Sequence, residues 1–219
     1  MANGTIYKRK VRHVGCGDLQ KPGDYNDITF PVNVSASIPL ALGRAAKHHV
    51  DIAILYILTA ILGRPLHETL YMRLPDGKWP DPYGSTRPLL KLNKTLYGIK
   101  QANHRYYEEV FHFIVDDLRL QASSTSPGLF FGGNLKANGV LIPVNVDDIM
   151  IIGKSDLVAS IASPPFDRFK AAGLVPVSDT FKYLGMTVTR DRSKLSIDID
   201  QMCYINRVLD QFEMTDCRM

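Results

Sequence analysis

The chain has 219 residues, of which 45% are hydrophobic and 22% are charged, and this composition supports one sizeable folded domain. The longest apolar run, residues 52–62, is shorter than the ~20 residues that a membrane-spanning helix needs, so we expect no membrane association. The formal net charge of +4 is compatible with a polyanionic partner but does not require one.

The N-terminal segment contains the densest basic run of the chain, formed by Lys8, Arg9, Lys10 and Arg12. Taken alone, such a run is most typical of a solvated strand or tail. No apolar stretch or small-residue cleavage site follows it, so we expect an intracellular protein, cytoplasmic or nuclear, rather than a secreted one. The cysteines show no C-x-x-C spacing and are expected to be free thiols: Cys16, Cys203 and Cys217.

The first predicted element is a helix that begins near Ser37 and ends near His49. We expect Ser37 to cap this helix, and Pro39 suits its first turn because no backbone N–H is needed there. A strand is predicted over residues 50–57. Residues 73–88 are crowded with Pro, Gly and Asp, which predicts a loop.

A second helix is predicted over residues 103–120, because its apolar residues recur at steps of four, three and four: Tyr107, Phe111, Ile114 and Leu118. A short apolar segment, 129–131, and a Gly/Asn-rich connection follow it. Residues 140–152 then show the pattern of a β-hairpin with Asp147 and Asp148 near its tip.

The last part of the chain predicts a helix over residues 166–172 and strands over 181–188 and 194–199. A final helix is marked by four apolar residues: Ile205, Val208, Leu209 and Phe212. Because helices alternate with antiparallel hairpins along the chain, we expect an α+β fold.

The stretch VNVDDIMII, residues 144–152, places Asp147 and Asp148 between two apolar runs. Hairpin turns often carry Asp, because this residue tolerates unusual dihedrals. Two carboxylates against a buried strand, however, repel each other and raise a pKa unless a cation lies beside them. The pattern alone leaves two interpretations open, an ordinary turn and a metal site.

Six segments resemble, in this order, the reverse transcriptase of copia-type long-terminal-repeat retrotransposons. A set of ordered motifs with matching gaps is far more specific than any one of them, and the resemblance extends from about Tyr7 to Cys217. The segments are GDLQKPGDYNDITFPV (17–32), ILGRPLHETLYMRLPDG (61–77), KLNKTLYGIKQANHRYYEEV (91–110), LIPVNVDDIMIIGKS (141–155), FKYLGMTV (181–188) and INRVLDQFEMTDC (205–217).

The resemblance implies a right-hand polymerase with fingers, a palm built on an antiparallel sheet, and a truncated thumb. Residues 1–219 would then form a single reverse transcriptase domain. Within it we expect fingers-like segments at about 1–49 and 73–105, palm-like segments at 50–72 and 106–192, and the start of the thumb at 193–219.

The chemistry implied by the resemblance is nucleotidyl transfer, in which a primer 3′-hydroxyl attacks the α-phosphate of a deoxynucleotide between two Mg²⁺ ions. The implied partners are an RNA or DNA template-primer, a deoxynucleoside triphosphate and, as an alternative, a partner polymerase chain. Asp147 and Asp148 match the family's acidic pair and would be both catalytic residues and metal ligands.

The family's first metal-binding Asp corresponds to Tyr56 in this chain. Asp51 is the nearest preceding acid, but on an extended strand it would lie ~16 Å away and point to the opposite face. We therefore expect an impaired polymerase that holds Mg²⁺ or Mn²⁺ weakly, with at most one ion at Asp147 and Asp148.

The resemblance also indicates nucleotide-binding positions, some of which depart from the family. Lys10 and Arg12 match basic residues that bind the triphosphate, and Gln101 matches a Gln near the incoming nucleotide. Ile61 stands where an aromatic residue usually excludes a ribose 2′-hydroxyl. Asn145 replaces a Tyr two places before the acidic pair, and Cys16 replaces an Arg of the fingers.

Three functional hypotheses remain open at this point. The chain is an impaired reverse transcriptase domain, a non-catalytic remnant that binds nucleic acid or a partner polymerase, or a hydrolase or phosphotransferase that uses Asp147 and Asp148 with one metal ion. The third is the weakest, because one adjacent acid pair makes a poor metal cage.

Overall fold

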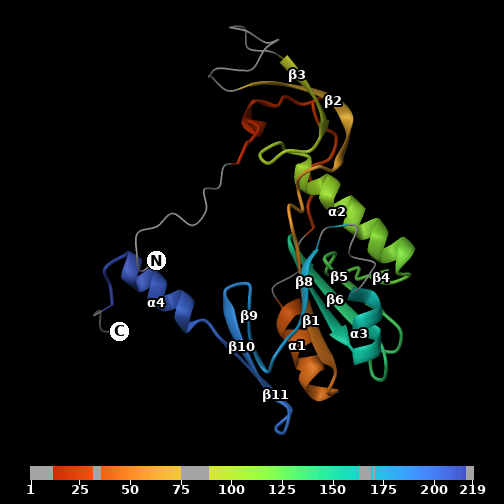
Figure 1. The fold of residues 1–219 in the computed structure, drawn as a ribbon, viewed down its shortest axis with the longest axis vertical. Coiled ribbons are helices and arrows are strands. Elements are labelled where there is room, and N and C mark those ends of the chain that lie inside the picture. The colour runs from red at the N-terminus through yellow and green to blue at the C-terminus, as the bar shows by residue number, and fades with distance from the viewer. Residues whose placement is uncertain (1–11, 32–35, 75–88, 163–168, 170, 216–219) are drawn as a thin grey trace. The chain divides into compact units, whose positions relative to one another are not determined.

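The structure is a computed structural model that describes residues 12–31, 36–74, 89–162, 169 and 171–215. The chain divides into two compact units (Figure 1). The first unit consists of Met1–Phe30 and Ile61–Phe111, and the second of Pro31–Ala60 and His112–Met219.

The first unit contains a two-stranded antiparallel sheet, in which β2 (Pro65–Arg73) pairs with β3 (Leu89–Lys94). Helix α2 (Ala102–His112) follows, and a π-helical turn, Phe113–Asp117, continues the chain in the second unit. A small apolar core holds the first unit together, and it consists of Leu70, Ile99 and Ala102 with Ile61, Leu66 and Leu92 packed against them.

The second unit is built on a six-stranded sheet in which every strand runs antiparallel to its neighbours. The strands, in spatial order, are β4 (Gln121–Ala122), β5 (Leu129–Gly132), β6 (Val140–Asn145), β7 (Asp148–Gly153), β1 (Asp51–Ile57) and β8 (Ala171–Pro176). The three central strands are rich in Val, Ile and Leu and are buried along most of their length, as expected for strands that are covered on both faces.

Two helices pack against this sheet. Helix α1 (Ser37–Lys47) contacts β6 and β7, and helix α3 (Ser155–Ala162) contacts β1 and β7. The core beneath α1 includes Ile52 and Ile54 of β1 together with Met150 and Ile152 of β7.

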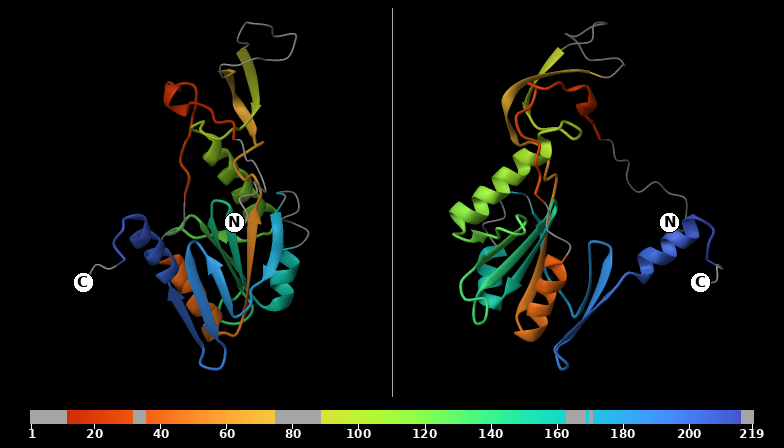
Figure 2. Two further views of the ribbon diagram at one scale, coloured as in Figure 1. Left: turned by 60° about the vertical axis from the view of Figure 1, so that its left-hand side comes forward. Right: turned by 180° about the vertical axis from the view of Figure 1, so that it is seen from behind.

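A three-stranded sheet completes the second unit and leads into the last helix (Figures 1 and 2). Its strands are β9 (Thr180–Tyr183), β10 (Met186–Asp191) and β11 (Ser196–Asp200), and helix α4 (Met202–Gln211) follows. Tyr183 and Val188 join the core that α1 forms with the large sheet. Within the described residues, no helix is long and apolar enough to cross a membrane.

Most of the predicted elements are confirmed. The helix predicted near Ser37 is α1, the strand over 50–57 is β1, and the hairpin over 140–152 is the β6–β7 pair. The short segment at 129–131, the strand at 194–199 and the final helix correspond to β5, β11 and α4. The α+β class is therefore correct. The helix predicted over 103–120 corresponds to α2 and its π-helical turn.

Three predictions about local structure are wrong. Ser37 does not cap α1: Ala36 occupies the flanking position, and the buried Ser37 hydroxyl lies 2.9 Å from that of Ser126. The predicted strand over 181–188 is a hairpin, because Leu184 and Gly185 adopt positive φ values of 48° and 79°. Two residues of this conformation form the tight turn that joins antiparallel strands.

The third wrong prediction is the helix over 166–172. Residues 163–168 and 170 lie outside the described part of the chain, but Ala171 and Ala172 belong to strand β8. Pairing with β1 supplies the backbone hydrogen bonds of this segment and overrides its helical tendency. The helix of this region is α3, which ends at Ala162, before the predicted helix begins. The loop predicted over 73–88 begins one residue too early, since Arg73 is still in β2, and residues 75–88 are not described.

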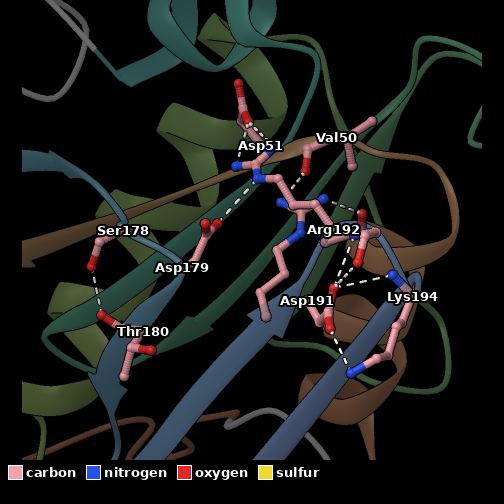
Figure 3. A network of polar contacts seen from close by, with 11 residues as sticks. Val50, Asp51, Ser178, Asp179, Thr180, Asp191, Arg192 and Lys194 are labelled. Carbon is pink, nitrogen blue, oxygen red and sulfur yellow. Dashed lines mark hydrogen bonds and ion pairs between the residues drawn. The ribbon is translucent and has the colours of Figure 1, made fainter.

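Polar contacts from β10 connect the two sheets of the second unit. The buried guanidinium of Arg190 donates to the backbone oxygens of Val50 at 2.9 Å and Ala45 at 2.8 Å. Nearby, Arg192 lies between Asp51 and Asp179 and pairs with both carboxylates (Figure 3). These contacts fix the end of α1 and the start of β1 against β10.

Replacing Arg190 with Met should destabilise the protein, because the change removes both donors and leaves the Ala45 and Val50 carbonyl groups unpaired in the core. We expect the free energy of unfolding in urea to fall by about 2–4 kcal/mol. The control is Arg192→Met, whose half-exposed ion pairs contribute less than about 1 kcal/mol. Equal losses in the two variants would contradict the assignment of Arg190 as the main contact.

Candidate metal and catalytic site

The acid pair lies where the β6–β7 hairpin turns. Asn145 ends β6 and pairs directly with Asp148, the first residue of β7, so Val146 and Asp147 form the turn. Val146 has a φ of +48°, which is rare for a β-branched residue and costs on the order of 1–3 kcal/mol. The hairpin therefore holds this turn against an unfavourable backbone conformation.

The register of β1 against β7 places Tyr56 beside this turn. Tyr56 is the cross-strand partner of Asp148, whereas Asp51 pairs with Gly153 at the other end of the same ladder. The backbone N–H of Ile57 donates to the carbonyl oxygen of Asp147 at 2.8 Å. Asp51 thus lies at the far end of the ladder from Asp148, as the strand spacing predicts.

Alternation along the strands puts several polar side chains on one face of the sheet. Ile54 of β1, Met150 of β7 and Leu141 of β6 belong to the core beneath α1. Because side chains two or four residues apart share a face, Tyr56, Asp148 and Asn145 lie on this face too. Tyr183 of β9 packs into the same core. Tyr56, Asn145, Asp148 and Tyr183 form what we call the polar cluster.

The surroundings of Asp148 disfavour the charged form of its carboxyl group. Burial raises the pKa of Asp148 above its ordinary value, and the charge of Asp147 raises it further. Burial and then the charge of Asp148 raise the pKa of Tyr56. Tyr56 is therefore a neutral phenol near pH 7 and supplies no anionic ligand.

Tyr183 is a member of the polar cluster that the sequence reasoning missed. Its side chain is 2% exposed, and its hydroxyl has no hydrogen-bond partner within the described residues. Burial raises its pKa strongly, the charge of Asp148 adds to this, and the Asn145 side chain offsets part of it. The signal in the sequence was a Tyr directly before the Leu-Gly turn of FKYLG.

The described carboxylates do not form a two-ion centre. In the described ranges, no three His, Cys, Asp or Glu side chains come close enough to hold a metal ion. The two neighbouring carboxylates come from one hairpin, and the adjacent strand β1 contributes a phenol. A two-ion centre needs carboxylates from more than one segment to hold both ions, so the described residues do not fit one.

Two predicted nucleotide-binding residues lie in the first unit. Gln101 is fully buried, where its amide accepts from Gln20 Nε2 at 3.0 Å and donates to the Asp24 carbonyl oxygen at 3.2 Å. Ile61 packs against the small core of this unit, and its carbonyl oxygen accepts from the Thr95 hydroxyl at 2.5 Å. Gln101 and Ile61 therefore both make contacts that stabilise the first unit, independently of any nucleotide.

The predicted basic residues are only partly described. Arg12 is exposed, with its guanidinium carbon 5.4 Å from the centroid of the Tyr97 ring, while Lys10 lies outside the described residues. Cys16 and Cys203 are exposed free thiols, as predicted, and Cys217 is not described. Cys16 helps to line a groove of about 800 Å³ between the N-terminal segment and β2.

Comparisons with known proteins identify a family for nearly the whole chain. Residues 3–219 match the family described as "Reverse transcriptase (RNA-dependent DNA polymerase)". The chain is 32% identical over 215 residues to "Retrovirus-related Pol polyprotein from transposon TNT 1-94" of Nicotiana tabacum, a match that covers 97% of this chain and 16% of the relative.

Two similar proteins come from Arabidopsis thaliana. The chain is 34% identical over 155 residues to the Pol polyprotein from transposon RE1, covering 69% of this chain and 10% of that protein. It is 30% identical over 160 residues to the one from transposon RE2, covering 72% and 11%. The chain thus spans about a tenth to a sixth of the length of these relatives.

Replacing Asp148 with Asn should stabilise the metal-free protein at pH 7. A carboxyl whose pKa is raised on folding favours the folded state while protonated, and this contribution is lost as the pH rises through the raised pKa. The advantage of the variant should therefore vanish below the ordinary Asp pKa of 3.8 and grow above it. Urea unfolding in the presence of a chelator, repeated across the pH range, measures the difference.

The companion variant for this measurement is Asp147→Asn. Because the Asp147 charge contributes to the raised pKa of Asp148, this variant should shift the loss of stability to lower pH. A wild-type protein as stable as Asp148→Asn at pH 7 would contradict the electrostatic description of the site.

Proposed function

Because the chain belongs to the reverse transcriptase (RNA-dependent DNA polymerase) family, with copia-type retrotransposon Pol polyproteins among its relatives, we propose that it is an RNA-directed DNA polymerase domain with impaired nucleotidyl transfer. The observation that carries this proposal is the cross-strand pairing of Tyr56 with Asp148. A phenol thus stands where a second segment would supply its carboxylate to the acid site.

The impairment follows from the charge that the reaction develops. Negative charge spreads over the transferred phosphate in the transition state, and divalent ions stabilise it only where carboxylates hold them in place. A neutral Tyr56 holds no second ion, and its ring fills space that the ion needs. The acid pair then binds Mg²⁺ or Mn²⁺ weakly, with at most one ion at Asp147 and Asp148.

Asp51 gives no substitute for the missing carboxylate. It lies at the opposite end of β1, where it pairs with Arg192 and accepts a hydrogen bond from the Ser155 hydroxyl. Moving it to the acid site would require a shift of five residues along a buried ladder, and such an odd shift would exchange the two buried faces of β1 and disrupt the packing on both.

The remaining parts of the proposal concern the lobes and the nucleotide. Residues 1–49 and 73–105 act as fingers, 50–72 and 106–192 as palm, and 193–219 as the start of the thumb. In this proposal Lys10 and Arg12 bind the triphosphate of the incoming nucleotide, Ile61 takes the position next to its sugar, and Gln101 acts near the nucleotide. The amide of Gln101 would first have to exchange its bonds to Gln20 and Asp24.

The partners in this proposal are a template-primer and a deoxynucleoside triphosphate. The alternative is a non-catalytic remnant that binds nucleic acid or a partner polymerase chain. Such a remnant would use the basic residues for binding and would need no metal ion. A hydrolase or phosphotransferase with one ion at the acid pair has the least support, since the site offers carboxylates from a single hairpin.

The wild-type chain should add no nucleotide to a pre-annealed primer in Mg²⁺, and Tyr56→Asp should be necessary for any recovery. Restoring the carboxylate restores ion binding first, because activity also depends on the positions of sugar and primer. Adding Ile61→Phe and Asn145→Tyr should then raise the rate and the preference for deoxynucleotides, since misplacement costs on the order of 10²-fold. Single-nucleotide incorporation is the assay.

Tyr71→Asp is the matched control, because it introduces the same charge at an exposed tyrosine of β2. It should leave the protein as inactive as the wild type. A wild-type chain that incorporates nucleotides as fast as the triple variant would refute the assignment of Tyr56 as the disabling residue.

Nucleic-acid binding should weaken as salt rises, because Lys and Arg side chains that contact phosphates release counterions. Replacing both Lys10 and Arg12 with Ala should reduce the slope of log affinity against log salt concentration by about one to two units. Lys136→Ala, at an exposed lysine between β5 and β6, is the control and should leave the slope unchanged. Fluorescence anisotropy at several salt concentrations gives the slopes, and equal slopes throughout would place Lys10 and Arg12 away from the nucleic acid.

A further inference from the structure

Besides the two carboxylates, a third side chain with an oxygen atom lies at the acid site, that of Asn145. Asn145 is the direct cross-strand partner of Asp148 and lies on the same face of the sheet. Side chains of such pairs have their Cβ atoms roughly 4.5–5.5 Å apart, a distance that one ion can bridge. Amide oxygens of Asn are common ligands of hard cations, beside carboxylates.

A buried hydroxyl lies at the same place. Tyr183 is almost completely buried, and its oxygen makes no hydrogen bond to the described residues. Leaving such a group unpaired in a core costs about 1–3 kcal/mol. Its polar neighbours belong to the polar cluster, since Asp148, Asn145 and Tyr56 all influence the pKa of this hydroxyl. The hydroxyl thus lies beside the Asn145 amide and near the Asp148 charge without a hydrogen bond of ordinary geometry, which indicates a missing ligand atom.

We propose that Asn145 is a third ligand, which together with Asp147 and Asp148 holds a single divalent cation, and that Tyr183 positions this site by donating to a ligand oxygen or to water on the ion. This inference rests on the proposed metal-binding role of the acid pair. It goes beyond that role by assigning functions to Asn145 and Tyr183.

The ligand chemistry determines the kind of cation. Two carboxylates and one amide give a site of low charge, with flexible side chains and several positions left for water. Mg²⁺ demands near-ideal octahedral geometry, so larger ions such as Mn²⁺ or Ca²⁺ suit this set better. The neutral Tyr56 leaves no carboxylate for a second ion.

Calorimetric titration of the full metal-free chain with MnCl₂ tests the role of Asn145. Asn145→Ala should weaken Mn²⁺ binding about tenfold or more, which is the usual loss of affinity when a residue that supports a metal site is replaced. Asn145→Asp should tighten it about tenfold, because the variant keeps the shape of the side chain and adds a charged ligand. Asn138→Asp adds the same charge at an exposed position between β5 and β6 and should leave the affinity unchanged.

Tyr183→Phe separates positioning from a purely structural role. Because the hydroxyl has no partner in the metal-free protein, its removal should leave the free energy of unfolding unchanged or raise it. The same variant should weaken Mn²⁺ binding by about tenfold. Tyr71→Phe, at an exposed tyrosine, is the control for both measurements.

The variants distinguish the failure of this inference from the failure of the metal role itself. If Asp148→Asn weakens Mn²⁺ binding while both Asn145 variants and Tyr183→Phe match the wild type, the inference is wrong and the acid pair keeps its role. If Asp148→Asn changes nothing, or neither the wild type nor Asn145→Asp binds Mn²⁺, the metal role and this inference fail together. Neither result bears on whether the wild type extends a primer.

Discussion

The ladder between β1 and β7 is the interaction on which the rest of the second unit depends. It pairs six consecutive residues of each strand, from Asp51 with Gly153 to Tyr56 with Asp148. Both strands are buried along most of their length, so a slip of one residue would exchange the side chains of the two buried faces and disrupt the packing on both. This constraint fixes the core beneath α1 and, at the end of the same ladder, the neighbours of the acid pair.

The apolar core and the polar site require different properties of the residues in this ladder. The apolar core needs only nearly continuous apolar runs that fill both faces of the sheet, which β1 and β7 supply. The site needs charges that balance one another, yet Asp148 is partly buried beside Asp147 and a neutral Tyr56. The fold therefore tolerates a carboxyl with a raised pKa at the turn of the β6–β7 hairpin, and a bound cation would favour its charged form.

The elements that could be predicted from the sequence are those whose signal is local. β1 and the β6–β7 hairpin are runs of β-branched residues, and the position of Tyr56 beside the acid pair followed from the resemblance together with strand alternation. The missed features depend on partners far along the chain. The Ser37 hydroxyl turns to Ser126, the segment after residue 170 pairs with β1, and Tyr183 reaches the acid site from another sheet. No local pattern contains this information.

The most direct test of the account is to locate the ions themselves. Crystals of the wild-type chain with template-primer, nucleotide and Mn²⁺ should give one anomalous scattering peak, next to Asp147 and Asp148, with the Tyr56 ring beside Asp148. Two peaks ~3.5–4 Å apart, the spacing of a two-ion centre, would contradict the account, because β1 places the phenol of Tyr56 beside Asp148 and its one carboxylate, Asp51, at the other end of the ladder.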